Sequence, residues 1–168
     1  MLTFARRHEL STAEALLAET EAAVATTPGW HEWLWRLRLC QVRAELALER
    51  GAYDAALAEA NEGIRQSRTK GRPKYEALGL IARAHALHAV GRTQDAVADA
   101  RDAVSVARGV ADPALLLLAL DAWLELDGDN ASSAEARALD AQISLALPDQ
   151  TIRQRFSESE VVQRVRRL

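Results

Sequence analysis

His85 and His88 are the two residues whose types and spacing come closest to a site for chemistry. They stand three residues apart on one expected helix, so the two imidazoles share a face and could hold a metal ion together. A third ligand would have to come from elsewhere, for example from Cys40 on an earlier helix. Two histidines alone are more typical of a groove or a surface. We therefore expect no metal site and no cofactor, while metal or small-molecule sensing through His85 and His88 stays an alternative.

The other motifs do not favour catalysis either. GRPKYEALG, from Gly71 to Gly79, has glycines but lacks the Gly-Lys-Ser/Thr ending and the preceding strand of a phosphate-binding loop. No serine lies in the sequence surroundings of a nucleophile elbow. Paired acids such as Glu158 and Glu160 lie in a tail segment, where a solvated surface is expected. The sequence therefore predicts no catalytic residue and a protein that is not an enzyme.

Charge and composition limit the partners. The 168 residues carry a formal net charge of −3, which gives no whole-molecule attraction to nucleic acid. The most apolar run, Ala114–Leu120, is far shorter than the ~20 residues of a membrane span. Cys40 is the only cysteine, so it cannot form a disulfide within the chain. We expect a cytoplasmic protein with neither a nucleic-acid nor a membrane partner.

The elements that must position these residues follow an internal repeat. GAYDAALAEA, from Gly51 to Ala60, returns forty residues later as GRTQDAVADA, from Gly91 to Ala100. A half-copy near Ala15 precedes them, and a third copy follows at an offset of 38. In that third copy Ala134, Ala136 and Ala138 match Ala96, Ala98 and Ala100. A period near forty is typical of an array of helical repeats.

Each copy consists of two expected helices joined by a bend. Gly51 and Gly91 end the first helix of their copies, and prolines mark the junctions between copies. We expect one all-α domain of about eight helices over residues 1–168. Its parts are an unpaired half-repeat at 11–26, helix pairs at 30–69, 73–110 and 113–147, and a C-terminal capping helix at 150–167. The unpaired start favours a fragment of a longer protein, or an amino end that docks on another chain.

The positions of small and aromatic residues resemble the tetratricopeptide repeat (TPR) from about Trp30 to Leu147. The matching positions are a small residue (Ala44, Ala84), a glycine (Gly51, Gly91), an aromatic residue (Tyr53) and an Ala-Leu or Ala-Val pair (Ala56-Leu57, Ala96-Val97). The copies are 38 to 41 residues apart rather than 34. The resemblance implies a TPR-like α-solenoid, which is a right-handed superhelix of stacked antiparallel helix pairs. HEWLWRLRL and the stretch from Arg72 to Tyr75 also resemble long-repeat arrays of bacterial ATP-dependent transcriptional regulators and cyclase-linked signalling proteins.

The resemblance further implies that the first helix of each pair lines a concave groove that binds a protein or peptide segment. The groove residues carried over by position are Arg38, Gln41, Glu45, Leu48, Ile81, His85, His88 and Trp123. Because these side chains are mixed, we expect an apolar segment with a few polar anchors. Trp30 and Trp33 are expected in the core, and Trp35 on a contact surface. Self-association into a homodimer stays an alternative, and the last helix filling the groove stays another.

Overall fold

The computed structural model describes residues 9–26, 29 and 31–167 of the chain. These residues form nine helices and no strand, so the expected all-α fold is confirmed. The helices are α2 (Leu10–Thr26), α3 (Glu32–Glu49), α4 (Tyr53–Lys70), α5 (Pro73–Ala89), α6 (Thr93–Val110), α7 (Pro113–Leu126), α8 (Asn130–Ala146), α9 (Gln150–Ser157) and α10 (Glu160–Arg167). Pro28 and Trp30, which the sequence assigned to a junction and to the core, lie outside the described residues.

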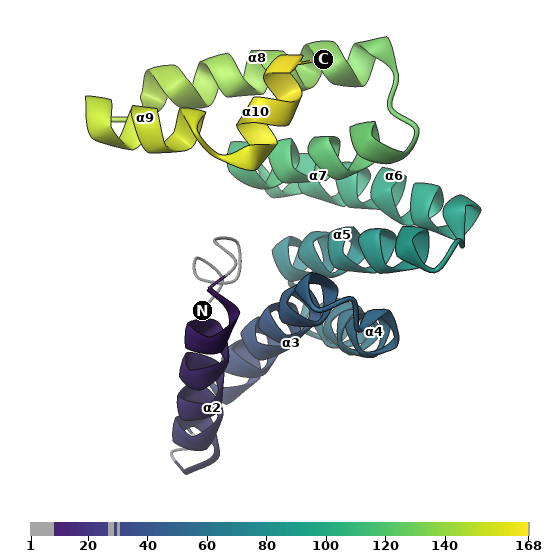
Figure 1. Cartoon of the computed structure of the whole chain (residues 1–168), viewed down its shortest axis with the longest axis vertical. Coiled ribbons are helices and arrows are strands. Elements are labelled where there is room, and N and C mark those ends of the chain that lie inside the picture. The colour runs from purple at the N-terminus through teal and green to yellow at the C-terminus, as the bar shows by residue number, and fades with distance from the viewer. Residues whose placement is uncertain (1–8, 27–28, 30, 168) are drawn as a thin grey trace.

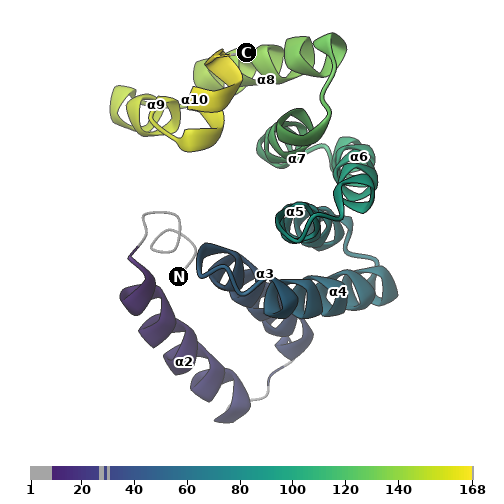
Figure 2. The same ribbon diagram turned by 45° about the vertical axis from the view of Figure 1, so that its right-hand side comes forward.

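The helices pack in consecutive pairs along the chain, and the stack is curved (Figures 1 and 2). The pairs that follow the repeat are α3 with α4, α5 with α6, and α7 with α8. α5 also contacts α3 and α7, whereas α4, α6 and α8 do not contact one another. The first helices of the pairs therefore lie on the inner side of the curve, and the second helices lie on its outer side.

Gly51 and Gly91 form the same bend in successive pairs. Both adopt the left-handed backbone conformation, with φ of 69° and 80°. The residue after each glycine donates its backbone N–H to a carbonyl five residues earlier, at 2.8 Å from Ala52 and 2.9 Å from Arg92. Glycine reaches this conformation without the steric cost of a Cβ atom, which is why it ends these helices. The equivalence that the sequence predicted for the two glycines is confirmed.

Packing within the first two pairs also repeats at an interval of forty residues. Small residues at equivalent positions of the helix crossings are buried, namely Ala44 and Ala84, and Ala56 and Ala96. Alanine at a crossing lets two helix axes approach closely. One ion pair recurs as well, because Arg43 lies 3.7 Å from Glu59 and Arg83 lies 2.6 Å from Asp99. The first two helix pairs are thus structurally equivalent repeats.

The third pair departs from the sequence match. The offset of 38 aligned Ala134 and Ala138 with two alanines of α6 that are buried. In the structure Ala134 and Ala138 are exposed, and Ala136 between them is buried instead. A shift of two residues along a helix changes the direction of a side chain by about 200°. The offset of 38 therefore aligns identical residues of α6 and α8 that lie on different faces of their helices. This part of the alignment was wrong.

The C-terminal segment forms two helices where the sequence predicted one over 150–167. α9 ends at Ser157, and the hydroxyl of Ser159 donates to the carbonyl of Phe156 at 2.7 Å. α10 then starts in a new direction and packs against α7 and α8, as Figure 1 shows. In this orientation α10 buries Val162 and Val165 completely. This extra helix explains the count of nine.

At the other end of the stack, α2 packs against α3. Ala13 of α2 forms a small apolar cluster with Val42 and Leu46 of α3. The tryptophans of α3 differ in exposure: Trp33 is half-buried, with the Arg72 guanidinium 4.6 Å from its ring centroid, and Trp35 is 52% exposed. Among the described helices, none combines the length and the apolar character that crossing a membrane requires.

Candidate functional site

A cavity of about 640 Å³ lies on the inner side of the curve. Three first helices, α3, α5 and α7, line it, and the segment from Phe156 to Arg164 closes it from the opposite side. In Figure 2, α9 and α10 lie on the side of the stack toward which it curves. We call this cavity the concave groove. It runs across successive helix pairs, so a chain segment lying in it would contact more than one repeat.

The floor of the concave groove is apolar. It is formed by Leu48 of α3, Leu78 and Ile81 of α5, and Leu117 and Leu118 of α7. All but Leu117 are only partly buried, so their side chains keep surface to offer to a bound segment. Apolar surface left accessible in a concavity is typical of a site that contacts another molecule.

The rim of the concave groove is acidic. Five carboxylates line it, and the only guanidinium among the lining residues described is that of Arg164. The carboxylates are those of Glu45, Glu49, Asp121, Glu158 and Glu160. The groove therefore carries a negative charge, and it favours positively charged groups on a ligand.

Arg164 of α10 lies at the centre of a charged cluster. Its Nη2 is 2.5 Å from Oδ2 of Asp121, and its Nε is 2.8 Å from Oε1 of Glu125. Nδ1 of His85 lies 3.8 Å from the other oxygen of Glu125. Burial lowers the pKa of the His85 imidazole, and the carboxylates of Glu125 and Asp121 offset part of this effect. His85 is therefore neutral at pH 7 and can accept or donate a hydrogen bond in the groove.

The structure brings four of the eight expected groove residues together in this cavity. Glu45 and Leu48 come from α3, and Ile81 and His85 come from α5. The two helices contact each other directly, which places these residues side by side. His88, one turn further along α5, is exposed and does not line the cavity.

Arg38 and Gln41 do not line the concave groove, but hydrogen bonds connect them to Glu45, which does. Nη1 of Arg38 donates to Oε1 of Gln41 at 3.0 Å. Nε2 of Gln41 in turn donates to Oε1 of Glu45 at 2.9 Å. These two side-chain hydrogen bonds along α3 hold the Glu45 carboxylate in place at the rim.

Trp123 lies outside the concave groove. Its side chain is 7% exposed and belongs to the apolar core, and the Arg101 guanidinium lies 4.9 Å from its ring centroid. The residues of α7 that do line the groove follow the helical spacing i, i+3, i+4 and i+7, from Ala114 to Asp121. Trp123 follows Asp121 by two residues and so lies on another side of the helix. That spacing is the signal in the sequence that would have pointed to Leu117, Leu118 and Asp121.

His85 and His88 do not gain a third ligand in the part of the chain that the structure describes. No three side chains of His, Cys, Asp or Glu there come close enough to hold a metal ion. The charged groups that act on His85 are the carboxylates of Glu125 and Asp121 and the guanidinium of Arg164. A cation beside the imidazole opposes metal binding at this position.

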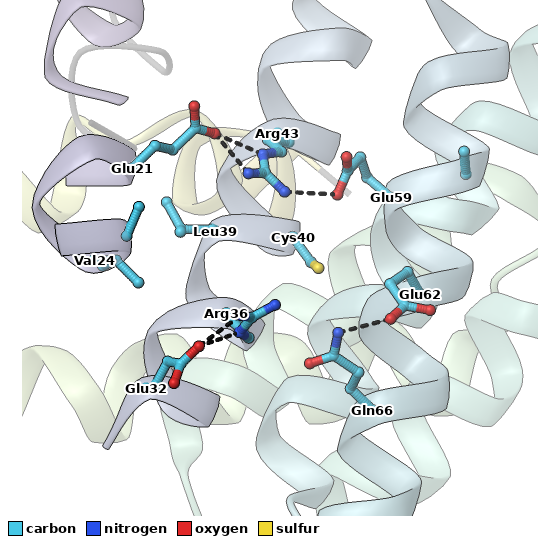
Figure 3. A pocket seen from close by; sticks show the side chains of 12 residues that line it. Glu21, Val24, Glu32, Arg36, Leu39, Cys40, Arg43, Glu59, Glu62 and Gln66 are labelled. Atoms are coloured by element: carbon cyan, nitrogen blue, oxygen red, sulfur yellow. Dashed lines mark hydrogen bonds and ion pairs between the residues drawn. The ribbon is translucent and has the colours of Figure 1, made fainter. Parts of the chain in front are cut away.

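A second cavity, of about 580 Å³, lies between α2, α3 and α4 (Figure 3). Its charged groups are paired, with Arg43 2.7 Å from Glu21 and Arg36 2.5 Å from Glu32. Cys40 lies on its wall, and burial, with the nearby Glu59 carboxylate, raises the pKa of the thiol to about 11. The thiol is therefore protonated at neutral pH and a poor nucleophile. The sequence did not predict this cavity, because its walls come from three different helices.

Comparison with known proteins does not assign the chain to a family. No family model matches it, and neither does a curated protein or a solved structure.

Proposed function

We propose that this protein is a non-enzymatic, TPR-like scaffold that binds a segment of another protein in the concave groove. The repeated bend at Gly51 and Gly91 and the repeated Arg43–Glu59 and Arg83–Asp99 ion pairs support a repeat array. The right-handed solenoid type is what the sequence resemblance implies. By its sequence resemblance we place it in a bacterial regulatory or signalling protein of the cytoplasm.

The observation that carries the proposal is the composition of the groove. It has an apolar floor, an acidic rim and a volume of about 640 Å³, and it is lined by α3, α5 and α7 together. Packed helices lie ~8–10 Å apart, so a segment crossing all three helices makes contacts over a distance of about 20 Å. A peptide with apolar side chains and flanking positive charges fits these surfaces.

Selection from a random peptide library on the immobilised full chain tests this function. Peptides enriched on the wild-type protein should bind the variant Leu118→Asp at least tenfold more weakly, because Leu118 lines the groove floor and belongs to no apolar core cluster. The control is Leu145→Asp, which makes the same change at a side chain that is 85% exposed. Peptides that bind both variants and the wild type alike would place the binding site elsewhere and refute the groove.

A further inference from the structure

The C-terminal helix α10 lies on α7 and α8, at the edge of the concave groove, and we call the surface beneath it the α10 site. It is an amphipathic helix of eight residues. Its two inward side chains, Val162 and Val165, are 0% exposed and pack into the core cluster formed largely by α5, α6 and α7. α10 thereby packs against α7 and α8.

Two arginines of α10 complete this contact with charge. Arg164 donates from Nε and Nη2 to both carboxylate oxygens of Asp121, at 3.1 and 2.5 Å. Arg166 donates in the same two-pronged way to Asp140 of α8, at 2.7 and 2.9 Å. The two acceptors are largely buried, with side-chain exposures of 7% for Asp121 and 11% for Asp140. Buried carboxylates are costly without a cation, so this surface requires arginine from whatever covers it.

The helix that precedes α10 is not itself buried. α9 has no buried residue, and Phe156 near its end is only partly buried against the core cluster. A helix from another protein with valine-sized apolar residues and two arginines would satisfy the same surface.

We propose that α10 is an intramolecular occupant of the α10 site, and that the partner segment of the concave groove ends in an arginine-bearing amphipathic helix that takes the place of α10 there. This inference rests on the proposed function of the concave groove, and it adds the chemistry of the partner. While α10 is docked, it competes with that partner for Asp121 and Asp140. Because α10 is tethered, its effective concentration is on the order of millimolar, which weakens the apparent affinity for the partner.

The probe is a fluorescein-labelled synthetic peptide of residues 149–167, measured by fluorescence anisotropy against three full-length proteins. In the release variant Val162→Asp/Val165→Asp, α10 can no longer dock. We expect this variant to bind the peptide at least tenfold more tightly than the wild type. The control Leu145→Asp/Ile152→Asp places the same charges at exposed positions and should behave as the wild type. A peptide carrying Arg164→Glu and Arg166→Glu should bind the release variant at least tenfold more weakly.

A second release variant, Arg164→Glu/Arg166→Glu, keeps both valines and undocks α10 by charge repulsion. It covers the case in which the aspartate substitutions unfold the protein, which circular dichroism detects. Equal binding of the peptide to all hosts, no binding to either release variant, or equal binding of the charge-reversed peptide would each overturn the proposal. Sedimentation showing a wild-type dimer that the peptide dissociates would also overturn it, in favour of exchange of α10 between two copies. Library peptides that still depend on Leu118 would leave the groove function standing in each of these cases.

Discussion

Replacing Val162 by alanine should loosen α10 without unfolding the stack. Full burial of one valine contributes ~1.5–3 kcal/mol, so Val162 and Val165 together hold α10 with about 3–6 kcal/mol. The ion pairs of Arg164 and Arg166 add about 0–1 kcal/mol each, because these two side chains are 39% and 42% exposed. The sum is below or near the ~5–15 kcal/mol that unfolding of a whole domain requires. α10 is therefore expected to open on its own, as a local event.

The size of the effect follows from the methyl groups removed. Val162→Ala deletes two buried methyl groups and leaves a small cavity, which costs about 2 kcal/mol. Such a change raises the population of the open form about thirtyfold, since each 1.4 kcal/mol is a factor of about ten. An undocked helix of this length does not persist in water, so its amides exchange with solvent.

Hydrogen exchange followed by mass spectrometry measures this directly. Peptides covering 160–167 should exchange about thirtyfold faster in Val162→Ala, while those of α4, α5 and α6 keep their wild-type rates. Ile152→Ala is the matched control, because Ile152 lies on α9 and is 41% exposed. Unchanged exchange at 160–167 would refute the estimate. An equal acceleration in all helices would show that α10 is an inseparable part of the core.

Three further predictions concern the stack itself. Ala96→Leu should lower the free energy of unfolding by about 1–3 kcal/mol in urea titration, because Ala96 is fully buried at a helix crossing. The control Ala98→Leu, on the exposed side of α6, should change this free energy by less than about 0.5 kcal/mol. Arg83→Ala should lower the free energy of unfolding by about 1–3 kcal/mol in the same assay. The substitution leaves the Asp99 carboxylate, which is 7% exposed, without the guanidinium that donates to both of its oxygens. A decrease below about 0.5 kcal/mol would show that water replaces the guanidinium. Iodoacetamide should alkylate Cys40 slowly in the native protein at pH 8, because the residue is 4% exposed and the pKa of its thiol is raised to about 11. Alkylation should become rapid once urea unfolds the chain. Rapid alkylation of the native protein would contradict this burial.

The repeated part of the fold could be predicted from the sequence because glycine and alanine have narrow structural uses there. A helix that ends in a left-handed backbone conformation favours glycine at that position, and Gly51 and Gly91 meet this requirement forty residues apart. Alanines at crossings mark close helix packing in the same way, as Ala56 and Ala96 do. These requirements are local to one bend or one helix crossing, so the sequence alone predicts consecutive helix pairs.

The remainder depended on contacts between distant parts of the chain. Position by position, Trp123 matches a groove residue, yet its large ring is stabilised in the core, where Arg101 covers it. The break before α10 accompanies the burial of Val162 and Val165 on α7 and α8, which are far away in the sequence. The acidic rim joins carboxylates from α3, α7 and the C-terminal segment, which only the folded curve brings together.

Site-specific photo-crosslinking tests the central claim most directly, which is that a partner segment lies in the concave groove. A benzoylphenylalanine at Leu118 lies on the groove floor, and one at Ala98 lies exposed on α6, on the outer side of the curve. With a library-selected peptide bound to the full chain, the account predicts covalent capture of the peptide from position 118 and none from position 98. Capture from position 98, with none from position 118, would contradict it.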